Sequence, residues 1–150
     1  MPPILEVRNL QTHFFTRAGV LKAVDGVSFE IGAGEIIGLV GESGSGKSIT
    51  GFSILGLVDE PGRIVGGQIL FKGEDLTTLA PADMQKMRGS RIAMIFQDPM
   101  MTLNPVLRIE TQMIEAIQTH DSSVSKDEAR ERSRDTVSYT HLRAHETSLH

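Results

Sequence analysis

Gly41-Glu42-Ser43-Gly44-Ser45-Gly46-Lys47-Ser48 decides how this chain can fold, because it fits the phosphate-loop pattern G-x-x-x-x-G-K-[ST] without a mismatch. Residues 35–40 before this octet are a short apolar run typical of a buried strand, and residues 48–58 after it carry apolar side chains at helical spacing. Strand, glycine loop and helix therefore occur in the order that the motif needs. The alternative is a glycine-rich turn that only joins a strand to a helix, but such a turn needs neither Lys47 nor Ser48.

The residue types of the octet suit a polyphosphate. Glycine adopts backbone conformations closed to other residues, so successive N–H groups can face phosphate oxygens. In this pattern Lys47 reaches the β- and γ-phosphates, and the Ser48 hydroxyl is placed to bind Mg²⁺. The positive end of the following helix dipole adds to the attraction. We therefore expect the octet, with Ile49 after it, to form a nucleotide-binding site.

The composition of the chain limits which classes of protein and which kinds of site are possible. The chain has 150 residues and 39% hydrophobic content, which is enough for one core and indicates one domain or most of one. A net charge of −4 with scattered Lys and Arg residues gives no indication of a nucleic-acid-binding face, and the lack of cysteine excludes disulfides and thiolate metal sites. No apolar run approaches the roughly 18 residues of a membrane span, and residues 1–4 do not resemble a signal segment. We therefore expect a soluble chain whose membrane role, if any, comes through a partner.

Alternating apolar residues predict an antiparallel β-layer at the start of the chain. The predicted strands of this layer and its continuation cover residues 4–10, 11–16, 21–31 and 64–72, the last with a Gly66-Gly67 turn inside it. Residues 78–88 follow as a short amphipathic helix. Residues 91–96 are a second continuous apolar run and are predicted to form another buried strand.

Gln97 directly follows that second apolar run, and Pro99 stops the strand soon after. A polar amide at the carboxyl end of a buried strand points into the crevice where α/β sheets bind ligands. An ordinary strand-ending glutamine is the alternative, and the upstream phosphate loop disfavours it. Phe14 and Phe15 form an aromatic pair of the kind that usually lies in a core, although one ring near a loop can stack on an adenine.

Together these segments resemble the nucleotide-binding subunit of an ABC transporter. The resemblance rests on Phe29–Ser48, followed further on by Ile95–Pro99 and Thr102–Pro105. Two segments are similar in particular to the oligopeptide/dipeptide importer branch, namely Ala23–Phe29 and Gln97–Pro105. The phosphate loop alone would indicate only a P-loop NTPase, and the glutamine segment makes the resemblance ABC-type.

The resemblance implies a role for each matching residue. The octet would be the Walker A loop, with Lys47 on the phosphates and Ser48 on Mg²⁺. Gln97 would be the Q-loop glutamine, which touches Mg²⁺ or the attacking water and couples the site to a membrane subunit, so Lys47 and Gln97 would serve catalysis. Phe14 falls where the family places its adenine-stacking aromatic, although Phe15 is a near neighbour and the choice between them stays open.

The resemblance also implies partners and a location. The subunit would lie on the cytoplasmic face of the plasma (inner) membrane, and pair with a second ATP-binding subunit of the same or another sequence. Hydrolysis of ATP between the two would drive permease subunits that import peptides or similar small solutes, with a solute-binding protein as an indirect partner and no nucleic acid. Residues 100–107 would lead into a helical subdomain that contacts the permease, with helices at 109–119 and 125–134. A P-loop ATPase outside transport and a nucleotide-binding remnant without turnover remain alternatives.

Three family segments are not found after Gln97 in this sequence: the signature Leu-Ser-Gly-Gly-Gln, the apolar run ending in the Walker B Asp-Glu, and the switch histidine. Because phosphoryl transfer needs a positioned water and a metal held from several sides, we expect hydrolysis only from a complete subunit. The expected fold is an α/β P-loop domain with an antiparallel β-layer over residues 1–134, truncated in its helical subdomain. Residues 135–150 match nothing in the family and are expected to lie outside the native fold. Their His141 and His145 lack the intervening Glu of an H-E-x-x-H metal motif.

Overall fold

A computed structural model describes residues 2–97 and 103–139 of the chain. It contains two compact units, Met1–Ala93 and Met94–His150. The elements of the first unit are β1 (Leu5–Thr16), β2 (Gly19–Ile31), α1 (Lys47–Ile54), β3 (Gly62–Phe71), β4 (Glu74–Asp75), the 3-10 turn η1 (Leu76–Thr78) and α2 (Pro81–Met87). Those of the second unit are α3 (Ile109–His120) and α4 (Lys126–Tyr139).

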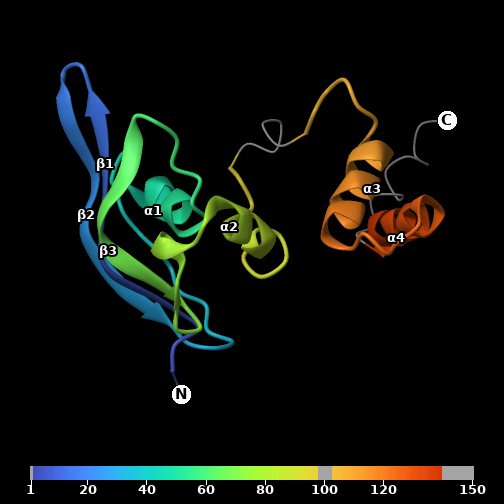
Figure 1. Ribbon diagram of the computed structural model, residues 1–150, viewed down its shortest axis with the longest axis horizontal. Coiled ribbons are helices and arrows are strands. Elements are labelled where there is room, and N and C mark those ends of the chain that lie inside the picture. The colour runs from blue at the N-terminus through green and yellow to red at the C-terminus, as the bar shows by residue number, and fades with distance from the viewer. Residues whose placement is uncertain (1, 98–102, 140–150) are drawn as a thin grey trace. The chain divides into compact units, whose positions relative to one another are not determined.

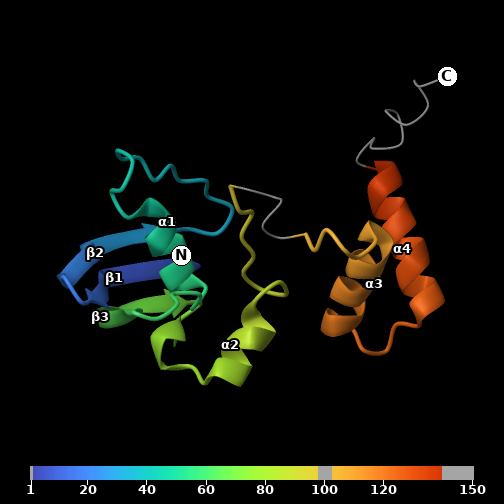
Figure 2. The ribbon, with the colours of Figure 1, turned by 90° about the horizontal axis from the view of Figure 1, so that it is seen from above.

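The first unit is built on a four-stranded sheet with the order β2-β1-β3-β4, in which all neighbours are antiparallel. Figure 2 shows the three long strands side by side, with β1 between β2 and β3. β1 therefore has hydrogen-bonding partners along both edges. The predicted antiparallel layer is confirmed, but the two strands expected at 4–10 and 11–16 are one continuous strand.

A bulge at Asn9 lets β1 continue where the sequence suggested two strands. Asn9 has a φ of 46°, and its N–H donates to the Ser28 hydroxyl on β2 at 2.8 Å. On β3, Gly67 has a φ of 86°, and a Cβ there would collide with the carbonyl oxygens of Arg8 and Asn9. The extra residue on β1 shifts the register against both neighbours. The turn predicted at Gly66-Gly67 is therefore wrong: these glycines lie inside β3, where the backbones approach closely.

One hydrophobic core holds the first unit together. Figure 1 shows α1 and α2 on the same side of the sheet, and the core lies between them and the strands. Its buried residues come from three strands, η1 and α2: Val7, Leu10, Val24, Ile69, Phe71, Leu76, Met84 and Met87. Ile49 and Ile54 of α1 pack against this cluster. The sheet and its helices thus bury a common apolar face, which fixes α1 against the strands.

The two buried strands predicted at 35–40 and 91–96 are not strands in this structure. Ile36 and Ile95 are both 98% exposed, and Val40 is 92% exposed. A parallel strand of this composition is stable only when neighbours pair with its backbone and cover both faces. Among the described residues the antiparallel sheet does not extend to either segment, and the second has only an isolated bridge between Ile92 and Arg88. The prediction is corrected on this point: the composition suits a strand, but the pairing is missing.

The second unit is a helical hairpin with a small core of its own. Ile114, Val124 and Ala129 are buried between α3 and α4, and the Arg130 guanidinium joins Glu110 across the two helices at 2.6 Å. The helices predicted at 109–119 and 125–134 are confirmed, and α4 continues to Tyr139. The histidine pair of the predicted tail lies outside the described residues, as do residues 98–102. In the part of the chain that is described, no helix combines the length and the hydropathy that crossing a membrane requires.

Candidate nucleotide-binding site

Gly46 joins the glycine loop to α1 and fits where another residue would not. It is the N-cap of the helix, with a φ of 90°, and its carbonyl oxygen accepts from the Thr50 N–H at 2.8 Å and from the Thr50 hydroxyl at 3.0 Å. A Cβ on Gly46 would collide with the Ala23 carbonyl oxygen of β2. The glycine therefore provides both a left-handed conformation and close contact between loop and sheet. This contact sets the start of α1 against β2.

The Lys47 ammonium is held by oxygens of the loop itself. It donates to the Gly41 carbonyl at 2.7 Å, to the Glu42 carbonyl at 2.6 Å and to the Ser45 hydroxyl at 3.2 Å. An ammonium has three N–H donors, so each of them has a partner. The charge of Lys47 is thus fixed at the glycine loop.

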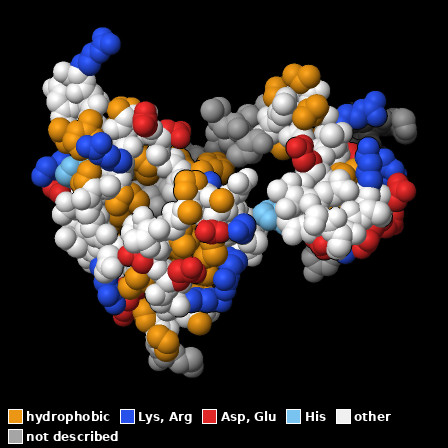
Figure 3. All heavy atoms as spheres, viewed as in Figure 1, with side chains coloured by type: hydrophobic (Ala, Val, Ile, Leu, Met, Phe, Trp, Pro, Cys, Tyr) orange, Lys and Arg blue, Asp and Glu red, His pale blue; other side chains and the backbone are white. Residues whose placement is uncertain are grey.

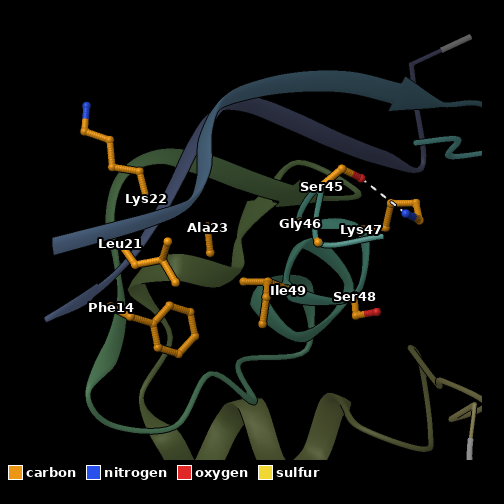
Figure 4. A pocket seen from close by; sticks show the side chains of 10 residues that line it. Phe14, Leu21, Lys22, Ala23, Ser45, Gly46, Lys47, Ser48 and Ile49 are labelled. Carbon is orange, nitrogen blue, oxygen red and sulfur yellow. Dashed lines mark hydrogen bonds between the residues drawn. The ribbon is translucent and has the colours of Figure 1, made fainter. Parts of the chain in front are cut away.

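A cavity of about 380 Å³ opens beside the loop and α1, which is a size typical of small-molecule sites. Figure 4 shows its two ends: Phe14 and Leu21 from the sheet lie at one, and Ser45 from the loop and Lys47 from the start of α1 lie at the other. The Lys22 side chain extends away from the cavity in this view, and its ammonium pairs with Asp25 at 3.3 Å. An apolar end next to a cationic end suits a ligand with a flat ring and a phosphate chain.

The structure separates the two neighbouring phenylalanines. Phe14 lines the cavity, and its ring lies against Gly62, where a Cβ would collide with it. Phe15 is 39% exposed, and the Arg63 guanidinium covers its ring at 4.2 Å from the centroid. Consecutive residues of a strand point to opposite faces of the sheet, so only one of the two can share a face with α1. That residue is Phe14.

Only some of the other predicted site residues line the cavity. The cavity is lined by Gly44, Ser45, Gly46, Lys47, Ser48 and Ile49, of which Ser48 is an exposed residue. Gly41, Glu42 and Ser43 are exposed at the start of the loop, and the first two contribute only their carbonyls to Lys47. Gln97 is exposed and belongs to the second unit, whereas the glycine loop belongs to the first. Its role beside Mg²⁺ stays a prediction.

A buried pair of hydroxyls that the sequence did not reveal ties α1 to β1. Thr12 and Ser53 are both buried, and their hydroxyl oxygens are 2.8 Å apart. The Ser53 hydroxyl also donates to the Ile49 carbonyl at 2.7 Å, which leaves Thr12 as the donor to Ser53. The available signal was weak: Ser53 follows Ile49 by four residues on the helix, but strict alternation from Val7 does not bring Thr12 to the core face.

Arg88, which follows α2, fixes the other end of α1. Its guanidinium donates to the Leu55 carbonyl at 2.7 Å and to the Gly56 carbonyl at 2.6 Å. Leu55 is the C-cap of α1 and Gly56 follows it, so the guanidinium lies where a helix leaves carbonyls without a partner and where a positive charge is favourable. Arg88 and the Thr12–Ser53 pair therefore hold the helix that carries Lys47.

Comparison with known families agrees with this geometry. The family model described as ABC transporter matches residues 24–149. Curated relatives include a probable peptide ABC transporter ATP-binding protein of Sinorhizobium fredii, y4tR, which is 48% identical over 130 residues and is aligned over 86% of this chain and 38% of the relative. The oligopeptide transport ATP-binding protein AppD of Bacillus subtilis is 50% identical over 133 residues, which are 88% of this chain and 40% of the relative. The chain thus spans about 40% of the length of these relatives.

Solved structures show the same fold. A dimeric structure of MJ0796, a bacterial ABC transporter cassette, gives a TM-score of 0.77 at 21% identity, and the match covers 89% of this chain and 56% of that one. A post-hydrolysis state of the same cassette bound to ADP and Pi gives a TM-score of 0.74 at 20% identity. Because the family model covers most of the chain and the cassette fold agrees with it, this chain belongs to the ABC transporter family.

Proposed function

We propose that this chain is the nucleotide-binding portion of an ATP-hydrolysing subunit that energises a membrane importer of peptides or similar small solutes. The observation that carries the proposal is the cavity in which Lys47, Ser48 and Phe14 lie together. The solute class is supported by relatives at 48 to 50% identity whose names specify peptide or oligopeptide transport. ATP hydrolysis is supported because it is a property of the ABC transporter family. No residue outside the cavity is used as support for it.

In this proposal the cavity accommodates ATP along its length. The adenine stacks on Phe14 at the apolar end, and the β- and γ-phosphates bind Lys47 and the N–H groups at the start of α1. The exposed Ser48 hydroxyl is a hard oxygen donor at the cavity and suits Mg²⁺, which would neutralise charge on the phosphates. Gln97 would contact the metal or the attacking water.

The proposal includes the partners that the resemblance to ABC transporter subunits implies. The subunit would pair with a second ATP-binding subunit and bind permease subunits at the cytoplasmic face of the membrane, and a solute-binding protein would deliver the solute. The cassette of similar fold is described as dimeric. No nucleic acid partner is proposed: on the face shown in Figure 3, Lys and Arg side chains are mixed with Asp and Glu rather than gathered into a basic patch.

We further propose that this chain by itself binds nucleotide without turning it over. Its sequence contains neither the signature segment nor the Walker B acids, which would hold the metal from a second side and position the attacking water. The assay is release of phosphate from ATP by the purified chain with Mg²⁺. Turnover at a rate typical of ATPases would contradict this part of the proposal and leave the binding site in place.

The binding site is tested by titrating the chain with a labelled ATP analogue. Lys47→Ala should weaken binding about 10- to 100-fold, because it removes charge-assisted hydrogen bonds to phosphate. Phe14→Ala should weaken it about 5- to 100-fold through loss of base stacking. Phe15→Ala is the matched control, since Phe15 lies outside the cavity and under Arg63. Equal losses for the two phenylalanine variants would contradict the proposed adenine position.

The transport role has a separate test at the source locus. Reading frames for permease subunits beside this chain would support the importer, and neighbours that act on DNA would favour an ATPase outside transport. This outcome is independent of the binding titration.

A further inference from the structure

The Ser45 side chain turns back onto the glycine loop. A Cβ added to Gly41 would lie 2.5 Å from the Ser45 Oγ, so the hydroxyl rests directly against the Gly41 backbone. From there it accepts a hydrogen bond from the Lys47 ammonium at 3.2 Å. Figure 4 shows this contact at the end of the cavity away from Phe14. The Ser45 hydroxyl therefore lies at the polar end of the cavity, next to the charge that would meet phosphate.

This contact matters for phosphate binding because all N–H donors of the Lys47 ammonium are already in use. Its three N–H groups go to two backbone carbonyls and to Ser45. The Ser45 N–H is also used within the loop, since it donates to the Glu42 carbonyl at 3.2 Å. A phosphate oxygen that binds Lys47 must therefore replace one of the three present acceptors.

Ser45 is the acceptor that can leave most easily. Its hydrogen bond to Lys47, at 3.2 Å, is longer than the bonds of 2.7 and 2.6 Å to the Gly41 and Glu42 carbonyls. A hydroxyl can also turn away by rotation about one side-chain bond, whereas a carbonyl moves only with the backbone. A charged phosphate oxygen is the stronger acceptor and would prevail in this exchange.

We propose that the Ser45 hydroxyl competes with phosphate for the Lys47 ammonium, an inference that rests on the proposed nucleotide site. It accepts one of the three hydrogen bonds of the Lys47 ammonium, and it must be displaced when the β- and γ-phosphates bind. It thereby lowers affinity for any polyphosphate, whatever base is attached. The side chain holds Lys47 in place without ligand and makes nucleotide release easier.

The test is Ser45→Ala in the whole chain, with titration calorimetry against ATP and against tripolyphosphate in the absence of Mg²⁺. Both ligands should bind about two- to tenfold more tightly, and by the same factor, because one ammonium donor no longer has to be freed. Ser90→Ala is the matched control: it removes a serine hydroxyl of the same unit that bonds to carbonyls of α2 and lies outside the cavity. Unchanged or weaker binding of these ligands overturns the proposal. Tighter binding of ATP that is not matched by tighter binding of tripolyphosphate also overturns it.

A second measurement does not depend on nucleotide. Acetylation of each lysine by a small anhydride, followed by mass spectrometry, should proceed faster at Lys47 in the Ser45→Ala chain, with Lys22 as internal reference. An unchanged rate at Lys47 overturns the inference even if the affinities shift. If the unsubstituted chain binds neither ATP nor tripolyphosphate, the proposed function fails, and the Lys47 rate still decides whether Ser45 restrains the ammonium.

Discussion

Replacing Ser53 by Ala should destabilise the first unit by about 1–3 kcal/mol, because it leaves the buried Thr12 hydroxyl without the acceptor that the structure gives it. The higher helix propensity of Ala offsets roughly 0.5 kcal/mol of this loss. Thr12→Val keeps the shape of the side chain, and Ser53 can still donate to the Ile49 carbonyl. We therefore expect the Thr12 variant to be the milder of the two.

The double variant Thr12→Val/Ser53→Ala makes the argument quantitative. With both hydroxyls gone, no polar group remains unsatisfied at this contact, so the loss should be smaller than the sum of the single losses by about 1 kcal/mol or more. The chain has no tryptophan and one tyrosine, so urea unfolding is best followed by circular dichroism. Hydrogen exchange of the α1 amides then shows whether the first unit is the part that opens.

Additive losses, within about 0.5 kcal/mol, would refute the idea that this hydrogen bond joins α1 to β1. Thr119→Val is the matched control, because Thr119 is exposed on α3 and bonds only to the Glu115 carbonyl of its own helix. Its effect should stay within about 0.5 kcal/mol.

Three further predictions concern the same unit. Gly46→Ala should abolish binding of labelled ATP, because the φ of 90° is strained for Ala and its Cβ would meet the Ala23 carbonyl; retained affinity would contradict this. Arg88→Ala should lower stability by about 1–3 kcal/mol in urea unfolding through loss of two hydrogen bonds from a charged group to the end of α1, and a change under 0.5 kcal/mol would count against that cap. Burial raises the pKa of Asp75, but hydrogen bonds from the Thr77 hydroxyl and N–H help to bring the pKa below its ordinary value. Since the carboxylate is favoured in the folded state, its contribution to stability is present above about pH 4 and is lost as the pH falls through the lowered pKa. Asp75→Asn should therefore make the stability less dependent on pH in that range of the acid unfolding curve. Identical curves for the two chains would contradict the role given to Asp75.

Local patterns predicted much of this fold. The helix after the loop, the helices α3 and α4 and the antiparallel layer follow from spacings of a few residues and from glycines that permit particular backbone angles. The segments at 35–40 and 91–96 could not be settled in this way, because a strand exists only through partners elsewhere in the chain. Their apolar residues predict burial, yet Ile36 and Ile95 are almost fully exposed among the described residues.

The choice between Phe14 and Phe15 shows where sequence reasoning ends. Strict alternation from Val7 along β1 would place every second residue on one face and would bring Phe15, not Phe14, to the side of α1. The bulge at Asn9 changes the parity, so that Leu10 and Thr12 follow Val7 into the core. Phe14 then faces the cavity and Phe15 does not.

The sequence by itself determined the phosphate loop, because the glycines, the lysine and the serine of Gly41–Ser48 act within one short stretch of backbone. Only the tertiary structure decided what surrounds that loop. Contacts between strands and helix selected Phe14 for the cavity, placed Ala23 against Gly46 and fixed α1 through Ser53. These contacts join residues far apart in the chain, and a local pattern carries no information about which distant residues will meet.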